Sequence, residues 1–245
     1  MLLSPTLVHV LLVLFIATLT RSAFGFGEAL IAVPLLALRI PVEIAAPLAV
    51  LVSITVAAVI VVQDWRHIHF KSAGGLVGST VIGIPLGLAL LIRVDEKHVK
   101  VLLSIVIVAF AVYSLFGRSR LELKKDSRRW LLGCGFFAGV LGGAYGMNGP
   151  PLAIYGAMRR WSPQHFRATL QGYFLPASLI GMVGYWLTGL WVPAVTHYYL
   201  WSLPLVVAAV FLGRMVNHRF AGDAFLKYVW VGLIGIGVVL FIQAI

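Results

Sequence analysis

Two short glycine-rich stretches are the parts of this sequence best suited to hold a ligand. Residues 25–28 read GFGE, and residues 146–151 read GMNGPP. Each stretch follows an apolar run and precedes a short apolar segment, 29–38 in one case and 152–158 in the other. The sequence predicts a helix, a break and a half-helix at both places. Because the first N–H groups of a helix are free and carry partial positive charge, two such breaks would suit an anion.

The candidate substrate-binding residues lie in or beside these two breaks. Glycine permits positive φ and lets the backbone approach a ligand closely. The alternative is that the glycines only allow tight helix packing, but two breaks at matched positions favour a site. The candidates are Arg21, Gly25, Gly27, Glu28 and Ala29 at the first break, Gly146, Asn148 and Gly149 at the second, and Gln171 one turn into the span that follows the second half-helix.

Four of these candidates have polar side chains whose roles the sequence leaves open. A carboxylate at Glu28 is unfavourable beside an anion, and its burial is costly unless it is paired. It could take a proton and couple transport to the proton gradient, pair with Arg21, or lie nearer the surface. Arg21 is then either a counter-charge for the substrate or the partner of Glu28. For Asn148, whose amide can donate a hydrogen bond, we favour a contact with the substrate. Gln171 is as well suited to hydrogen-bond a neighbouring helix as to bind a ligand.

Composition places these breaks in a membrane. Of the 245 residues, 61% are hydrophobic and only 11% are charged, whereas soluble domains have roughly 25% charged residues. The longest polar stretch, 117–129, is too short for a soluble catalytic or nucleic-acid-binding domain. The net charge of +11 comes from Lys and Arg in short loops between apolar segments, which is typical of membrane proteins. The single cysteine, Cys134, excludes an intrachain disulfide, and no Cys/His cluster has metal-ligand spacing.

Six stretches are long and apolar enough to cross a bilayer, which takes about 20 residues. They are 45–62, 74–92, 99–116, 168–187, 198–216 and 226–244. A shift of about 121 positions places Gly25 on Gly146 and repeats the order of one broken segment followed by three spans. We therefore predict two transmembrane repeats, 1–117 and 130–245, joined by a basic linker, 118–129.

The basic residues favour one topology for these repeats. If both broken segments cross the membrane, Lys and Arg divide almost evenly between the two sides. If both are re-entrant, each half crosses three times and the second half is inverted. The linker and most other basic residues then lie on one side of the membrane, and only Arg39, Arg93, Lys97 and Lys100 lie on the other side. Because cytoplasmic loops are rich in Lys and Arg, we predict a multi-pass inner-membrane protein with a cytoplasmic linker and both termini outside.

These motifs together resemble the sulfite exporter TauE/SafE family. Residues 25–34 (GFGEALIAVP) resemble its first-repeat motif, and residues 142–152 (GGAYGMNGPPL) resemble its second. Residues 64–66 (DWR), followed by 83–87 (GIPLG), are similar to its pattern after the second span. The sequence departs from the family at Glu28 and Asn148, where glycine is usual. The resemblance covers the whole chain and implies transport, often outward, of small sulfur-containing anions such as sulfite and organosulfonates.

The sequence thus predicts an all-α polytopic membrane protein of two inverted repeats, each with a broken, re-entrant helix and three transmembrane helices. Its expected function is secondary transport of a small sulfur-containing anion held between the two breaks near the membrane midplane. Proton coupling through Glu28 is one hypothesis, and an anion channel at the same site is the alternative function. We expect no catalytic residues, metal, cofactor or nucleic-acid partner. The expected partners are the anion and the lipid bilayer, and a homo-oligomer is left open.

Overall fold

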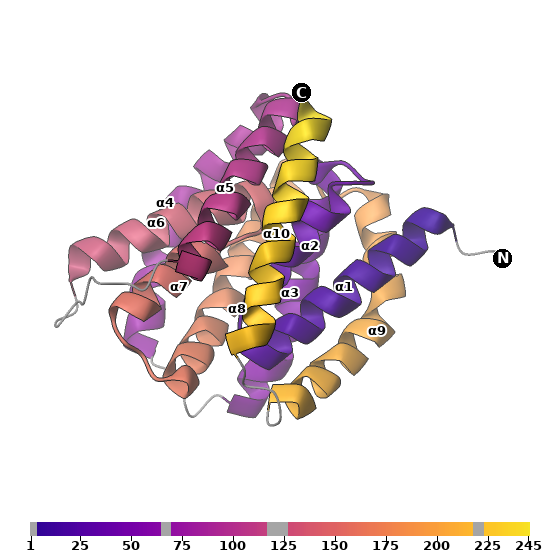
Figure 1. Cartoon of the computed structure of the whole chain (residues 1–245). Coiled ribbons are helices and arrows are strands. Elements are labelled where there is room, and N and C mark those ends of the chain that lie inside the picture. Colours follow the sequence, from indigo (N-terminus) through magenta and orange to yellow (C-terminus); the bar gives the residue numbers. More distant parts are fainter. Residues whose placement is uncertain (1–3, 65–69, 117–126, 218–222) are drawn as a thin grey trace.

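The computed structural model describes residues 4–64, 70–116, 127–217 and 223–245, and the regular structure within these ranges is entirely α-helical (Figure 1). Most of the expected linker (118–126) and residues 65–66 of one family motif lie outside the described residues. The helices of the described part are α1 (Pro5–Phe24), α2 (Glu28–Leu36), α3 (Val42–Asp64), α4 (Phe70–Arg93), α5 (Glu96–Phe116), α6 (Arg128–Tyr145), α7 (Gly149–Met158), α8 (Pro163–Leu187), α9 (Pro193–Asn217) and α10 (Asp223–Ala244).

Five helices of the described part are long and apolar enough to cross a membrane, namely α1, α3, α4, α5 and α9. Four of the six predicted spans coincide with α3, α4, α5 and α9. The predicted spans 168–187 and 226–244 form α8 and α10 but are not among the five. Gln171 and other polar residues lower the mean hydropathy of α8, and the described apolar part of α10, Trp230–Ala244, is short. The fifth span is α1, which the sequence assigned to a broken segment.

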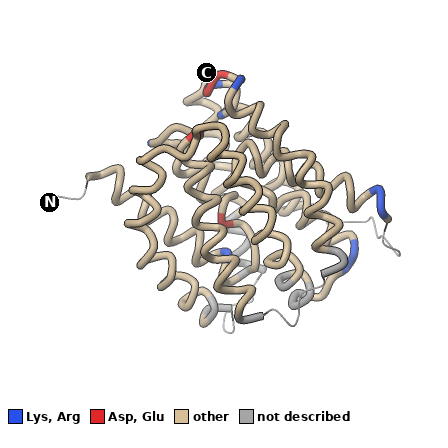
Figure 2. The backbone as a smooth tube through the Cα atoms, turned by 180° about the vertical axis from the view of Figure 1, so that it is seen from behind, with Lys and Arg blue, Asp and Glu red and all other residues tan. Residues whose placement is uncertain are grey.

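The outer surface of the helices is apolar, as a lipid environment requires. Large side chains such as Phe211, Val183 and Ile242 are more than half exposed. A soluble protein rarely leaves so much apolar surface in water. In Figure 2, charged residues gather at the ends of helices, apart from one neighbouring blue and red pair within the bundle. The chain is therefore an all-helical, multi-pass membrane protein.

Two junctions join a long helix to a short one. At the first junction (residues 25–27), α1 ends with Gly25 at φ 88°, and α2 begins directly after Gly27 at φ 98°. At the second junction (residues 146–148), α6 ends with Gly146 at φ 66°, and α7 begins at Gly149. A positive φ strains any residue with a Cβ, so these three positions require glycine.

The short helix α2 runs back along α1. The Thr18 hydroxyl donates a hydrogen bond to the Glu28 carboxylate at 3.0 Å, near the first junction. Farther along, the His9 ring nitrogen Nε2 donates to the Leu35 carbonyl at 2.9 Å. The chain therefore returns along α2 toward the level at which α1 began.

The closest helix contacts join the two halves of the sequence. Helix α4 packs most extensively on α6, and α1 on α9. A Cβ at Gly83 or Gly139 would overlap backbone atoms of the facing helix, so α4 and α6 touch backbone to backbone. Gly213 of α9 lies in the same way against Ser22 and the Leu19 carbonyl of α1. Such small-residue contacts are a common way to hold helices together in lipid, because close approach increases their van der Waals contact.

The apolar core consists of two clusters that meet at the first junction. The larger cluster joins α1, α2, α3, α5, α9 and α10 with parts of α4, α6 and α8, and the smaller joins parts of α3, α4, α6, α7 and α8. Phe26 packs against both clusters and contacts the rings of Phe166 and Trp230 at centroid distances of 5.8 and 6.3 Å. The first junction is thereby held in place by apolar packing from both sides.

Candidate functional site

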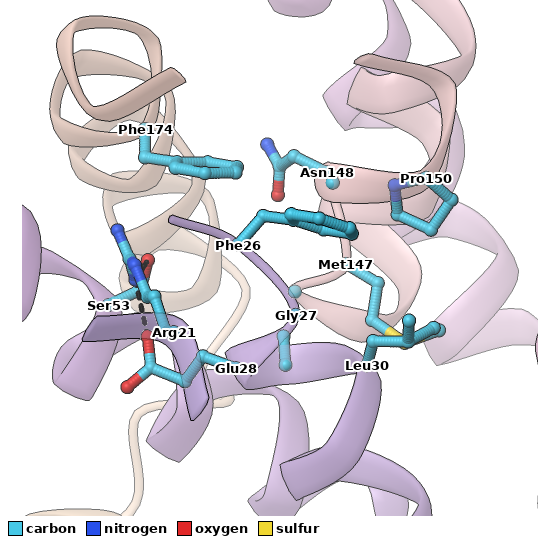
Figure 3. A pocket seen from close by; sticks show the side chains of 13 residues that line it. Arg21, Phe26, Gly27, Glu28, Leu30, Ser53, Met147, Asn148, Pro150 and Phe174 are labelled. Carbon is cyan, nitrogen blue, oxygen red and sulfur yellow. Dashed lines mark hydrogen bonds and ion pairs between the residues drawn. The ribbon is translucent and has the colours of Figure 1, made fainter. Parts of the chain in front are cut away.

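A small cavity lies between the first turns of α2 and α7, where the two junctions face each other (Figure 3). Its volume is about 20 Å³, which is room for about one water molecule. Its walls come from five helices and both junctions, and the lining residues are Arg21, Phe26, Gly27, Glu28, Ala29, Leu30, Ser53, Gly146, Met147, Asn148, Gly149, Pro150 and Phe174. We call this space the central cavity.

A buried ion pair forms one wall of the central cavity. The Arg21 guanidinium, near the end of α1, pairs with the carboxylate of Glu28, the first residue of α2. Both residues are 2% exposed. The return of α2 along α1 brings them together, and the Thr18 hydroxyl bonds the second carboxylate oxygen. An exposed Glu28 is therefore wrong, and the pairing alternative describes the structure.

Arg21 also binds neutral groups on two other helices. It donates hydrogen bonds to the Ser53 hydroxyl of α3 at 2.7 Å and to the Gln171 side-chain oxygen of α8 at 2.9 Å. Its guanidinium carbon lies 4.8 Å from the centre of the Phe174 ring. The Nε–H of Arg21 is buried and has no hydrogen-bond partner. Because the guanidinium has five N–H donors, it keeps donor capacity for a ligand.

Gln171 connects Arg21 to the first junction. Its oxygen accepts from Arg21, and its nitrogen donates to the Gly25 carbonyl at 2.7 Å. Both ends of the amide are thus bonded within the protein, so Gln171 holds Arg21 and Gly25 in place. A weaker bond, 3.2 Å between the hydroxyls of Ser53 and Ser178, also links α3 to α8.

The two helix starts at the cavity offer different donors. The first turn of α2 receives no side-chain cap, so the backbone N–H groups of Glu28, Ala29 and Leu30 have no capping acceptor. The first turn of α7 contains Pro150 and Pro151, which have no N–H. The α2 start is therefore the better anion-binding end, and the second junction contributes mainly the Asn148 amide.

The structure brings most of the predicted site residues to one place. Arg21, Gly27, Glu28, Ala29, Gly146, Asn148 and Gly149 line the central cavity, whereas Gly25 and Gln171 are bonded to each other beside it.

The sequence missed the lining residues Ser53, Phe26, Met147 and Phe174. Their helices or junctions meet only in the folded chain, and Ser53 reads from sequence as ordinary helix packing. Within the described residues, no group of three His, Cys, Asp or Glu side chains could hold a metal ion.

Comparison with known proteins points to one family. The family model described as Sulfite exporter TauE/SafE matches residues 10–240. The chain is also 26% identical over 230 residues to a protein of Cupriavidus necator described as a probable sulfite/organosulfonate exporter TauE. That alignment covers 92% of this chain and 89% of the relative. No solved structure matches the chain.

The buried ion pair makes a prediction about stability. Replacing Arg21 alone (Arg21→Met) strands a buried carboxylate and is expected to cost about 3–5 kcal/mol. Replacing both partners (Arg21→Met with Glu28→Leu) removes both charges and should recover most of that loss. The measurement is unfolding in detergent, by heat or denaturant. As a control, Lys100→Met breaks the partly exposed Lys100–Glu96 pair and should cost about 0–1 kcal/mol. A double variant as unstable as Arg21→Met would contradict the prediction.

Proposed function

Because the chain belongs to the sulfite exporter TauE/SafE family, we propose that it is a secondary transporter that exports small sulfur-containing anions such as sulfite or organosulfonates. The observation that carries this proposal is the buried guanidinium of Arg21 at the central cavity, next to the uncapped start of α2. In a membrane interior, a buried charged side chain normally marks a substrate or ion pathway.

The proposed binding site is the central cavity. An oxyanion there would accept hydrogen bonds from Arg21 and from the backbone N–H groups of Glu28 and Ala29. Guanidinium matches a group of three oxygens well, because its N–H donors form a planar fork. Gly25 and Gly27 of the first junction, Gly146 of the second and Gly149 at the start of α7 let the backbone approach the anion, and Gln171 acts by holding Arg21. A cavity of about 20 Å³ must widen to admit sulfite, so binding and opening are linked.

Proton coupling through Glu28 follows from competition for Arg21. An anion that binds the unused donors of Arg21 places a second negative charge beside one cation, so it competes electrostatically with the Glu28 carboxylate, whose other hydrogen-bond partner is Thr18. A buried carboxylate that loses its cation is costly, and taking up a proton removes the charge. Binding of the anion and protonation of Glu28 would then be linked.

We further propose that residues 1–117 and 130–245 are inverted repeats joined by the linker 118–129. A shift of about 121 positions relates α1–α5 to α6–α10 in order. When each helix is replaced by its counterpart in the other half, the packed pair α1–α9 becomes the packed pair α6–α4. The packed pairs α3–α8 and α5–α10 each consist of two counterparts, so they stay the same. Individual residue contacts show the same correspondence. Gly25 contacts Gln171, and their counterparts Gly146 and Val50 also contact each other. The return of α2 along α1 supports a re-entrant first segment.

The packing also suggests which parts would move during transport. Backbone contacts join α4 to α6, and the single hydroxyl hydrogen of Tyr185 of α8 is shared between the Gly142 and Gly143 carbonyls of α6. Likewise, α1 is joined to α2 and α9, and Thr55 of α3 is 2.7 Å from the Tyr199 hydroxyl of α9. We therefore propose two mixed units, one of α1, α2, α3 and α9 and the other of α4, α6, α7 and α8.

These mixed units meet at the central cavity. The hydrogen bonds of Gln171 to Arg21 and Gly25, and the contact between Ser53 and Ser178, cross from one unit to the other. Each of these bonds would break if the units parted to open the cavity. Alternating access would then occur between mixed units and not between the two sequence halves.

The proposed orientation can be tested on intact cells. With the linker cytoplasmic, a cysteine placed in residues 118–126 of a Cys134→Ala chain should resist a membrane-impermeant thiol reagent until the cells are permeabilised. Labelling of that cysteine from outside intact cells would reverse the orientation.

The transport proposal predicts saturable uptake of an organosulfonate into proteoliposomes that depends on the pH gradient; a sulfonate is used because sulfite itself takes up a proton near neutral pH. Glu28→Gln should remove the dependence on pH, because an amide cannot carry the proton. As a matched control, Glu96→Gln, at a partly exposed carboxylate of α5, should leave it unchanged. Unchanged pH dependence in Glu28→Gln would reject the coupling. Fast, uncoupled conductance in planar bilayers would favour an anion channel instead.

The mixed units predict the effect of cross-links in a Cys134→Ala background. Ser53→Cys with Ser178→Cys joins the two units, and its disulfide should stop transport until it is reduced. Gly75→Cys with Leu131→Cys joins α4 to α6 inside one unit. A Cβ at position 75 would lie 3.8 Å from Leu131 Cγ, so the two cysteines are close enough to pair. This disulfide should leave transport largely intact. Transport that continues with the first link formed, or stops with the second, would contradict the assignment.

A further inference from the structure

A chain of buried hydrogen bonds leads from α6 to the Asn148 amide at the central cavity. The Thr80 hydroxyl donates to the Gly135 carbonyl at 2.8 Å and lies 2.7 Å from the Tyr173 hydroxyl. A hydroxyl has one hydrogen, so Thr80 must accept from Tyr173. The hydrogen of Tyr173 is then used, and its oxygen accepts from Asn148 Nδ2 at 3.3 Å.

This chain fixes which end of the amide faces the cavity. With Nδ2 held by Tyr173, the oxygen Oδ1 of Asn148 is left for the cavity, and Figure 3 shows it directed toward Phe26, with the nitrogen on the opposite side. Asn148 is 6% exposed, and its amide lies against Gly142, where a Cβ would come within 2.8 Å of it. The second junction therefore presents a buried hydrogen-bond acceptor to the cavity.

The two sides of the cavity thus suit different hydrogen-bonding groups of a ligand. Arg21 and the start of α2 offer donors, and Asn148 offers an acceptor from another side of the same space (Figure 3). Resting on the proposed function, we propose that the site prefers anions that also carry a hydrogen-bond donor. Hydrogensulfite and hydroxyalkanesulfonates belong to this class, whereas sulfate and simple alkanesulfonates do not. Tyr173 and Thr80 are positioning residues for this preference, since they act through Asn148.

The test compares two probes of equal charge and similar size. 2-Hydroxyethanesulfonate has a hydroxyl donor, and ethanesulfonate has the same sulfonate without one. Binding to the purified full-length protein is measured by thermal stabilisation, which follows ligand concentration over Kd. The protein should bind the hydroxy compound roughly tenfold more tightly, since the other leaves Asn148 Oδ1 unpaired.

Variants of the hydrogen-bond chain separate positioning from general stability. Tyr173→Phe frees the amide to turn and should bring the ratio of the two Kd values close to one. Thr80 does not line the cavity, but Thr80→Val should also bring the ratio closer to one. Without the Thr80 hydroxyl, Tyr173 can donate its hydrogen to Asn148 Oδ1, and this oxygen then turns away from the cavity. Tyr185→Phe is the matched control: this buried tyrosine of α8 binds the Gly142 and Gly143 carbonyls. It should lower stability without changing the ratio.

The outcomes separate this inference from the proposed function. If the protein binds neither sulfonate, the organosulfonate part of the proposed function fails and the inference fails with it. If it binds both equally, the sulfonate site stands and the donor preference is wrong. An equal change of the ratio in Tyr185→Phe and Tyr173→Phe would also overturn the role of Tyr173. If Tyr173→Phe does not fold, Thr80→Val decides the question by the same ratio.

Discussion

The cost of a charge in a membrane interior governs the arrangement around the central cavity. Arg21 and Glu28 are each 2% exposed, and either side chain alone would leave an uncompensated charge buried among the helices. They meet because α1 stops at the first junction and α2 returns beside it. The supporting bonds from Thr18, Ser53 and Gln171 follow from the same need, since buried polar groups are stable only when they are hydrogen-bonded.

Close backbone packing supplies the rigid frame for this pair. Helix association in lipid has no hydrophobic driving force, so it depends on van der Waals contact and hydrogen bonds. The glycines of α4 and α6, and Gly213 against α1, provide that contact across the two sequence halves. The polar contacts at the cavity are fewer and lie between helices such as α3 and α8, where no such glycine contact is described. In the carrier that we propose, breaking the polar contacts between the two mixed units would leave the close backbone packing within each unit intact.

The sequence was most informative about local backbone and least informative about tertiary neighbours. Positive φ at Gly25, Gly27 and Gly146 is a local property, and glycine is the residue that signals it. The multi-pass helical class follows from composition, and the family from the order of motifs. Hydropathy alone separates the spans less clearly, because α8 carries polar residues that face the protein interior and α1 is itself long enough to cross. Ser53, Phe174 and Tyr173 could not be assigned, since their roles depend on helices that meet only on folding.

The two junctions share one backbone plan but have different chemistry. Under the shift of about 121 positions, Ser53 corresponds to Phe174, and both line the cavity next to Arg21. Arg21 itself corresponds to Gly142, and the Asn148 amide occupies the space that a side chain at 142 would need. A second arginine therefore has no room at the second junction while Asn148 is in place. If the two halves are the inverted repeats that we propose, the central cavity has a charged wall from the first half and a neutral, hydrogen-bonding wall from the second. The proposed site would then hold an anion in one orientation, which two identical charged walls would not define.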